Sequence, residues 1–144
     1  MTKLAAILLI FTVLGCKSTG KEKSNKKLTK EGTPKFEFQE EFHNFGSLQA
    51  GEVVAYNFQF KNSGDGILTI QKIDSDCGCL VVNFPKEEIA PGKSDYIEVI
   101  FNSAGETGNV LKEFEIYANI PAGTINLAIA ATVKNEIINL YSKN

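Results

Sequence analysis

The most distinctive chemistry in this sequence belongs to two cysteines separated by one glycine, Cys77-Gly78-Cys79, in a chain with three cysteines in all. In an extended strand, residues two apart point the same way, with Cα atoms about 6.6 Å apart. A disulfide requires about 5.5–6 Å and facing Cβ atoms, so this pair can bond only if the backbone bends at Gly78. Such a bond closes a very small loop, so it would stabilise the fold little and be readily reduced.

The same two sulfurs are a candidate ligand pair for a soft metal ion. Copper(I) accepts two or three ligands, whereas zinc(II) usually takes four. Besides Cys77 and Cys79, the candidate ligands include a single histidine, His43, so the composition favours copper(I) over zinc. A thiol-redox centre and two packed free thiols are the other interpretations that the sequence leaves open. His43 itself is expected to be a polar surface residue.

The third cysteine, Cys16, ends an N-terminal segment with the features of an export signal. Residues 4–14 form an apolar run with the length of a signal-peptide core, shorter than the ~20 residues of a membrane-spanning helix. The run ends in VLGC, which resembles a bacterial lipobox and implies acylation of the Cys16 thiol with cleavage before it. We therefore expect residues 1–16 to be a lipoprotein signal peptide and the protein to be anchored to a membrane of the bacterial cell envelope. In that compartment thiols can be oxidised.

Charge divides the remaining chain into two parts. Residues 17–35 hold seven lysines and two glutamates, a net charge of +5, and almost nothing apolar, which predicts a flexible tether. Residues 36–144 hold seven lysines and fifteen acidic residues, a net charge of −8, and the chain has no arginine. An acidic domain without arginine is a poor candidate for nucleic-acid binding, which requires a basic surface.

Residues 36–144 have the pattern of a single all-β domain. Apolar and polar side chains alternate in short segments separated by turn-forming residues: 35–42, 53–62, 67–73, 96–101, 110–119 and 124–135. About seven strands, with turns every 8–12 residues or so, predict a β-sandwich, and a β-barrel is the competing architecture.

Several short motifs resemble the bacterial family catalogued as domain of unknown function 1573. They are Phe45-Gly46, Gly51-Glu52, the run ending at Asn62 and Gly64, Cys77-Gly78-Cys79, Pro91-Gly92, Gly108 with Lys112, and Asn119. The resemblance covers roughly residues 36–133 and departs from the family at Leu80, where threonine is common. It implies an exported protein, often a lipoprotein, with an immunoglobulin-like sandwich related to ciliary and spindle proteins. It implies no activity, since the family has none assigned.

Motifs typical of enzymes are lacking in the sequence. PGKS at residues 91–94 imitates the end of a phosphate-binding loop, but Glu87 stands where the loop requires glycine. We therefore expect a noncatalytic, membrane-anchored module without a cofactor, which binds a protein or glycan partner through loops or a sheet edge. The alternative is a copper(I)-binding or thiol-redox lipoprotein that uses Cys77 and Cys79.

Overall fold

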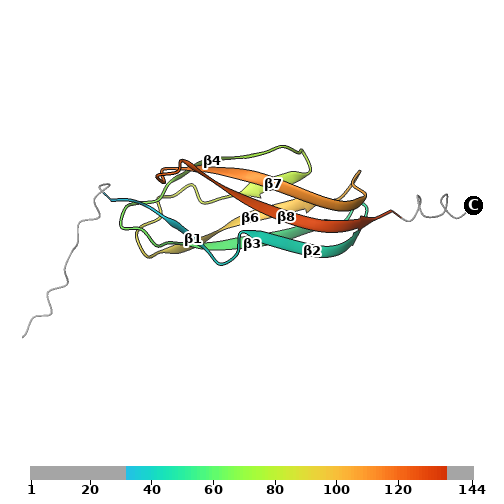
Figure 1. The fold of residues 1–144 in the computed structure, drawn as a ribbon, viewed down its shortest axis with the longest axis horizontal. Helices are drawn as coiled ribbons and strands as arrows, with labels where there is room; N and C mark the ends of the chain where they lie inside the picture. Colours follow the sequence, from blue (N-terminus) through green and yellow to red (C-terminus); the bar gives the residue numbers. More distant parts are fainter. Residues whose placement is uncertain (1–31, 136–144) are drawn as a thin grey trace, which may run out of the picture.

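The computed structural model describes residues 32–135, which form a two-layer β-sandwich (Figure 1). Its eight strands are β1 (Phe36–Phe38), β2 (Phe42–Gln49), β3 (Val53–Asn62), β4 (Ile70–Ser75), β5 (Leu80–Asn83), β6 (Ser94–Asn102), β7 (Gly108–Ala118) and β8 (Thr124–Lys134). The predicted signal peptide, Cys16 and most of the predicted tether lie outside the described residues. In the part that is described, no helix has the length and apolar character needed to cross a membrane.

The strands divide equally between two sheets. Sheet A has the order β1-β3-β6-β5, and sheet B has the order β2-β8-β7-β4. Neighbours within a sheet pair antiparallel except for β2 and β8, which run parallel. The predicted all-β immunoglobulin-like sandwich is therefore confirmed, with eight strands in place of about seven. The competing barrel is wrong, because the sheets do not join into one closed ring.

Alternation along the long strands builds the core between the sheets. Side chains two residues apart point to the same face of a strand, so each strand turns every second residue inward. The largest fully buried apolar side chains come from both sheets and from the loop before β4: Phe58, Phe60, Ile97, Val99, Phe101, Phe114, Ile116, Leu127, Ile129, Val133 and Leu68. This shared interior fixes the register of the paired strands, since a slip of one residue would expose it.

Local pattern misplaced three features of the fold. The single strand predicted over residues 35–42 is two strands, because the chain crosses from sheet A to sheet B between β1 and β2. The strand predicted over 67–73 begins later, at Ile70, while Leu68 makes an isolated bridge to Ile89. Residues 33–35, assigned to the tether, instead pack on the sandwich: the Ser63 amide donates to the Lys35 carbonyl oxygen at 2.9 Å.

The loops gather at the two ends of the long axis. One end, here called the N-terminal end, holds residues 32–35 and the loops 63–69, 84–93 and 119–123. The opposite end, here called the cysteine end, holds the loops 50–52, 76–79 and 103–107. Figure 1 shows the described chain entering at one end of the sandwich and β8 finishing at the other. The Cys-Gly-Cys motif therefore lies at the end farthest from residue 32.

Candidate functional site at the cysteine end

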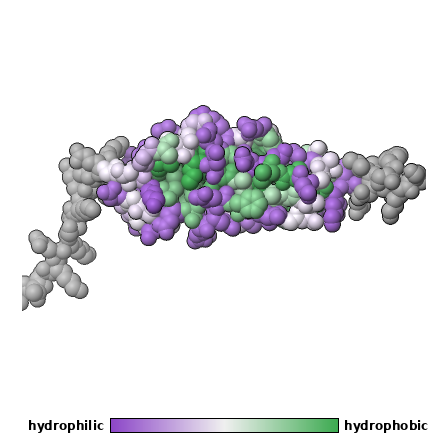
Figure 2. Space-filling view, in the orientation of Figure 1, coloured by the Kyte–Doolittle hydropathy of each residue, from purple (hydrophilic) through white to green (hydrophobic). Residues whose placement is uncertain are grey.

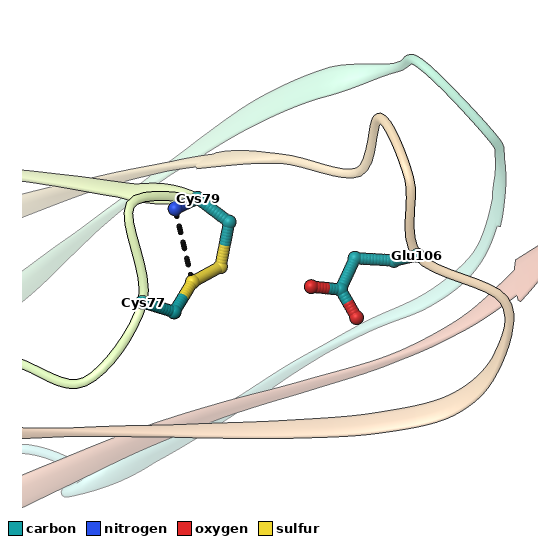
Figure 3. Close-up of side chains that lie close together, drawn as sticks. All are labelled: Cys77, Cys79 and Glu106. Carbon is teal, nitrogen blue, oxygen red and sulfur yellow. Dashed lines mark hydrogen bonds between the residues drawn. A yellow bond between two sulfur atoms is a disulfide. The ribbon is translucent and has the colours of Figure 1, made fainter.

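The Cys-Gly-Cys motif forms the crossing between the two sheets. β4 of sheet B ends at Ser75 and β5 of sheet A begins at Leu80, so the motif lies in a tight turn. The structure joins Cys77 and Cys79 in a disulfide with Cα atoms 5.2 Å apart, closer than an extended strand allows (Figure 3). Nothing lies within 4 Å of a Cβ placed on Gly78, so the turn projects into open space. The bend that the sequence required at the glycine is therefore present.

A third side chain, which the sequence did not suggest, lies close to the two sulfurs. Glu106, in the loop between β6 and β7, directs its carboxylate toward the cysteine pair (Figure 3). Ligand atoms of Cys77, Cys79 and Glu106 lie within 4.8 Å of one another, and all three residues are half-buried. His43, the other ligand considered from the sequence, does not belong to this group. The site therefore combines two sulfurs and one carboxylate from two loops.

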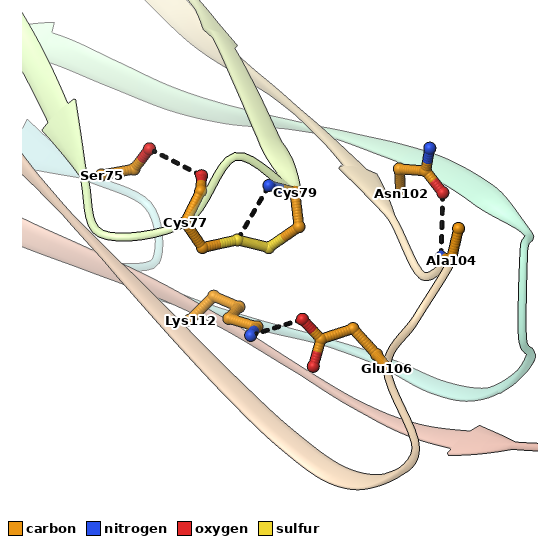
Figure 4. A network of polar contacts seen from close by, with 7 residues as sticks. All are labelled: Ser75, Cys77, Cys79, Asn102, Ala104, Glu106 and Lys112. Atoms are coloured by element: carbon orange, nitrogen blue, oxygen red, sulfur yellow. Dashed lines mark hydrogen bonds and ion pairs between the residues drawn. A yellow bond between two sulfur atoms is a disulfide. The ribbon is translucent and has the colours of Figure 1, made fainter.

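Lys112 of β7 fixes the position of this carboxylate. Its Nζ lies 2.7 Å from Glu106 Oε1, and the two side chains are 22% and 23% exposed (Figure 4). Local hydrogen bonds shape both loops: the Ala104 amide donates to Asn102 Oδ1 at 2.9 Å, and the Ser75 hydroxyl donates to the first cysteine's carbonyl oxygen at 3.4 Å. A half-buried ion pair between a strand and an anchored loop is better ordered than one on an open surface.

The surroundings of the motif are open to solvent and acidic. A pocket of about 370 Å³ lies beside it, lined by Asp76, Cys77, Leu111, Lys112 and Glu113. An adjoining pocket of similar volume shares two of these residues and adds further carboxylates, those of Asp74 and Glu115. Lys72 forms an ion pair with Asp74, and the other carboxylates leave the surface negative. This charge favours the approach of a cation over that of an anion.

A second feature of the cysteine end is an exposed aliphatic patch on sheet A. Ala55, Ile100 and Val81 are paired in one row across β3, β6 and β5, and Val53 lies two residues from Ala55 on the same face. The exposed fractions of Val53 and Val81 are 60% and 56%. We call these four residues the aliphatic patch. Figure 2 shows one face of the sandwich, on which hydrophilic side chains interrupt and border the hydrophobic ones.

His43 takes part in packing and not in the cysteine site. The sequence pattern predicted His43 at the end of the first strand, but it lies near the start of β2. Its side chain is 26% exposed. Its ring stacks on Tyr56 with centroids 3.6 Å apart. The Tyr56 hydroxyl donates to the Glu40 carboxylate, and this hydrogen bond raises the pKa of Tyr56 above its ordinary value. His43 is thus half-buried, in contrast to the expected surface position.

Residues 36–133, most of the chain, match the family described as "Protein of unknown function (DUF1573)". The chain belongs to this family. The resemblance noted in the motifs is therefore confirmed, and it extends over nearly all of the described sandwich. No curated protein matches the chain.

Solved structures similar to this DUF1573 protein share its fold. A protein of unknown function from Porphyromonas gingivalis W83 is 21% identical with a TM-score of 0.63, over 76% of this chain and 51% of that one. This chain thus spans about half the length of that protein. The ASH / PapD-like domain 7 of human CEP192 is 10% identical with a TM-score of 0.57, over 86% and 99% of the two chains. The VesB protease of Vibrio cholerae is 18% identical with a TM-score of 0.52, over 71% of this chain and 32% of the protease. At these identities the likeness concerns the fold alone.

Proposed function

We propose that this DUF1573 protein is a noncatalytic lipoprotein of the bacterial cell envelope that binds a protein partner through the aliphatic patch. The observation that carries the proposal is the uninterrupted row Ala55–Ile100–Val81, extended by Val53, on the outer face of a sheet. Apolar side chains gathered in one patch on a water-exposed surface are typical of interaction sites, whereas scattered ones are ordinary.

The chemistry of the patch favours a protein over a glycan. Its side chains are aliphatic, and polar residues border it, among them Asn57, Glu98 and Asn83 on the same three strands. An apolar centre with a polar rim is the usual composition of a protein–protein interface. A glycan presents hydroxyl groups, which would lose their water against this patch without receiving hydrogen bonds in return.

The position of the patch suits a protein held at its N-terminus. Acylation at Cys16 would anchor the chain, and residues 17–31 would lead from the anchor to the N-terminal end of the sandwich. The patch lies at the opposite end, since β3 and β5 both begin there (Figure 1). The interacting surface would therefore face away from the membrane, where a partner has access to it.

Site-specific photocrosslinking in intact cells tests the binding surface. A photoreactive residue at position 81 should form one discrete adduct that a protease removes and that Val53→Asp abolishes. The matched control is position 111, since Leu111 is an equally exposed aliphatic residue on sheet B. Adducts at both positions, an adduct that only a glycosidase removes, or an adduct of two copies of this chain would contradict the proposal.

Membrane fractionation tests the anchor separately. The wild-type protein should remain with the membranes after a high-salt wash and should incorporate labelled palmitate. Cys16→Ala should lose the label, because no thiol remains for acylation. Recovery of the unlabelled wild-type protein in the soluble fraction would contradict lipid anchoring without affecting the protein-binding surface.

The second candidate function is metal binding or redox chemistry by the thiols of Cys77 and Cys79. It is favoured by the position of Glu106 close to the cysteine pair. A disulfide this small stabilises a fold little, so stability alone does not account for it. The reduced form would offer two thiols, of which that of Cys77 lines an open pocket.

A further inference from the structure

We propose that, after reduction of the disulfide, Cys77, Cys79 and Glu106 form a binding site for a thiophilic divalent cation such as zinc(II). The site is separate from the aliphatic patch and does not depend on the protein partner. It also differs from the copper(I) site suggested by the sequence, since it adds a ligand and changes the charge of the preferred ion.

The donor set fits such a cation. Thiolate sulfur and carboxylate oxygen both bind zinc(II), and three protein ligands leave a fourth tetrahedral position for water. The ligand atoms already lie within 4.8 Å of one another. Lys112 contacts Glu106 Oε1, so we assign Oε2 as the oxygen that binds the ion. Copper(I) gains little from the carboxylate, because it prefers sulfur ligands.

Charge balance separates a divalent ion from a monovalent one. Two thiolates and the Glu106 carboxylate carry three negative charges, and Lys112 supplies one positive charge beside them. A divalent cation neutralises the remainder, whereas copper(I) leaves one negative charge in a half-buried site. Unneutralised charge away from water is costly, so the geometry points to the divalent ion.

The carboxylates around the loop reinforce this preference. Asp76 and Glu113 line the pocket beside Cys77, and Asp74 and Glu115 line the adjoining one. A free thiolate is disfavoured by such neighbours, but a cation is attracted to them and then stabilises the thiolate by coordination. The open pocket provides the path by which the ion reaches the sulfurs.

Binding requires a reductant, and we assign this role to an external dithiol. Two electrons and two protons pass from the dithiol to the Cys77–Cys79 disulfide, which breaks into two thiols while the dithiol closes into its own disulfide. The cation then displaces the two thiol protons, which are released to water, and binds both sulfurs and Glu106. The oxidised form, as in the structure, would not hold the ion.

Cobalt(II) is the probe, because its thiolate complexes absorb in the near ultraviolet. The full chain would be purified in detergent with Cys16→Ala, so that the pair supplies the remaining thiols, and reduced without oxygen. We expect one cobalt(II) per reduced chain, displaced by zinc(II), and none per oxidised chain. Cys77→Ser or Cys79→Ser should abolish the absorption. Equal cobalt binding by the oxidised and reduced chains would overturn the proposal.

Glu106→Gln identifies the third ligand. It should weaken cobalt(II) binding by about tenfold or more, whereas Glu113→Gln, which removes only a nearby charge of the same pocket and no ligand, should weaken it much less. Equal affinity of the Glu106→Gln and Glu113→Gln proteins would overturn the site. Displacement of zinc(II) by stoichiometric copper(I) would support the copper alternative instead.

Discussion

At the N-terminal end of the sandwich the buried side chain of Asn62 connects three segments, whereas at the cysteine end the buried side chain of Ser103 connects two. Asn62 Nδ2 donates to the Gly66 and Ile89 carbonyl oxygens at 2.8 and 2.9 Å, and Oδ1 accepts from the Lys35 amide at 3.3 Å. Ser103 Oγ accepts from the Gly51 amide at 3.1 Å and lies 2.9 Å from the carbonyl oxygens of Gln49 and Glu52. Both residues are fully buried.

The glycines of the loop 63–69 differ from Gly78 in the same direction. A Cβ on Gly66 would lie 2.4 Å from the Gly32 carbonyl oxygen, and one on Gly64 would lie 2.2 Å from that of Thr33. A Cβ on Gly78 would meet nothing within 4 Å. At the N-terminal end the backbones of the loop 63–69 and of residues 32–35 are thus in close contact, while the cysteine turn has room around it. This difference indicates that the first end supports the fold and the second is available for ligands.

The largest expected effect is the loss of the Asn62 side chain. Asn62→Ala removes hydrogen bonds to backbone groups of three segments, of which the Ile89 carbonyl oxygen keeps the Leu68 amide as a partner. Each buried group left without a partner costs about 1–3 kcal/mol, so we expect a loss of about 3–5 kcal/mol. Ser103→Ala should cost less, about 1–2 kcal/mol, because fewer groups lose partners. Urea unfolding measures both free energies. Equal losses would contradict the proposed difference between the ends.

A matched pair of glycine substitutions sharpens the comparison. Gly66→Ala forces backbone apart at the N-terminal end and should destabilise the domain by about 2–3 kcal/mol, the range of overpacked sites. Gly78→Ala meets open space and should change the stability by about 0.5 kcal/mol or less, as surface substitutions do. Thermal unfolding of the two variants distinguishes them. A larger loss for Gly78→Ala would show that the cysteine turn is as tightly packed as the opposite end.

Removal of the disulfide should have a moderate effect. Closing so short a loop removes little chain entropy, so Cys77→Ser with Cys79→Ser should cost about 1–2 kcal/mol at most. The measurement is urea unfolding of the double variant beside the reduced and oxidised wild type. A cost near that of Asn62→Ala would mean that the disulfide supports the fold, which would weaken the interpretation of the cysteine end as a ligand site.

The smallest effect is expected at Tyr56, which lies in β3 between the two ends of the sandwich. Its hydrogen bond to Glu40 raises its pKa, so the folded state favours the neutral phenol. The stability that this bond contributes is present below the ordinary pKa near 10 and is lost as the pH rises through the raised value. Ultraviolet titration should show Tyr56 ionising at lower pH in Glu40→Gln. An unchanged titration would mean that Glu40 does not set this pKa.

Most of the fold could be predicted from local pattern, but not all of its pairing. Strands β3, β6, β7 and β8 were placed because each is long and buries one face. Strand β5 has four residues, too few for a clear alternation, and β2 carries polar residues and a register shift between Asn44 and Ser47. The partner of β2 is β8, far away in sequence, and no local pattern encodes such a pairing.

The candidate site was predicted in part for a similar reason. The cysteine pair is visible in sequence because its spacing is unusual. Glu106 lies in a polar loop whose composition predicts only a turn, and its approach to the sulfurs depends on the tertiary fold. The aliphatic patch had a signal that was missed: in Val53-Val54 and Val81-Val82 two adjacent valines occupy one strand, so one of each pair must face outward.

The parallel pairing of β2 with β8 bears on how the domain can be made. Strand β2 lies at the edge of sheet B, and β8 is its one neighbour among the described strands. A chain that emerges from a ribosome or passes through a translocation channel N-terminus first cannot complete this sheet until residue 134 is available. Sheet B would therefore stay incomplete while most of the chain is being synthesised or exported. A truncation before β8 would leave β2 without a strand to pair with.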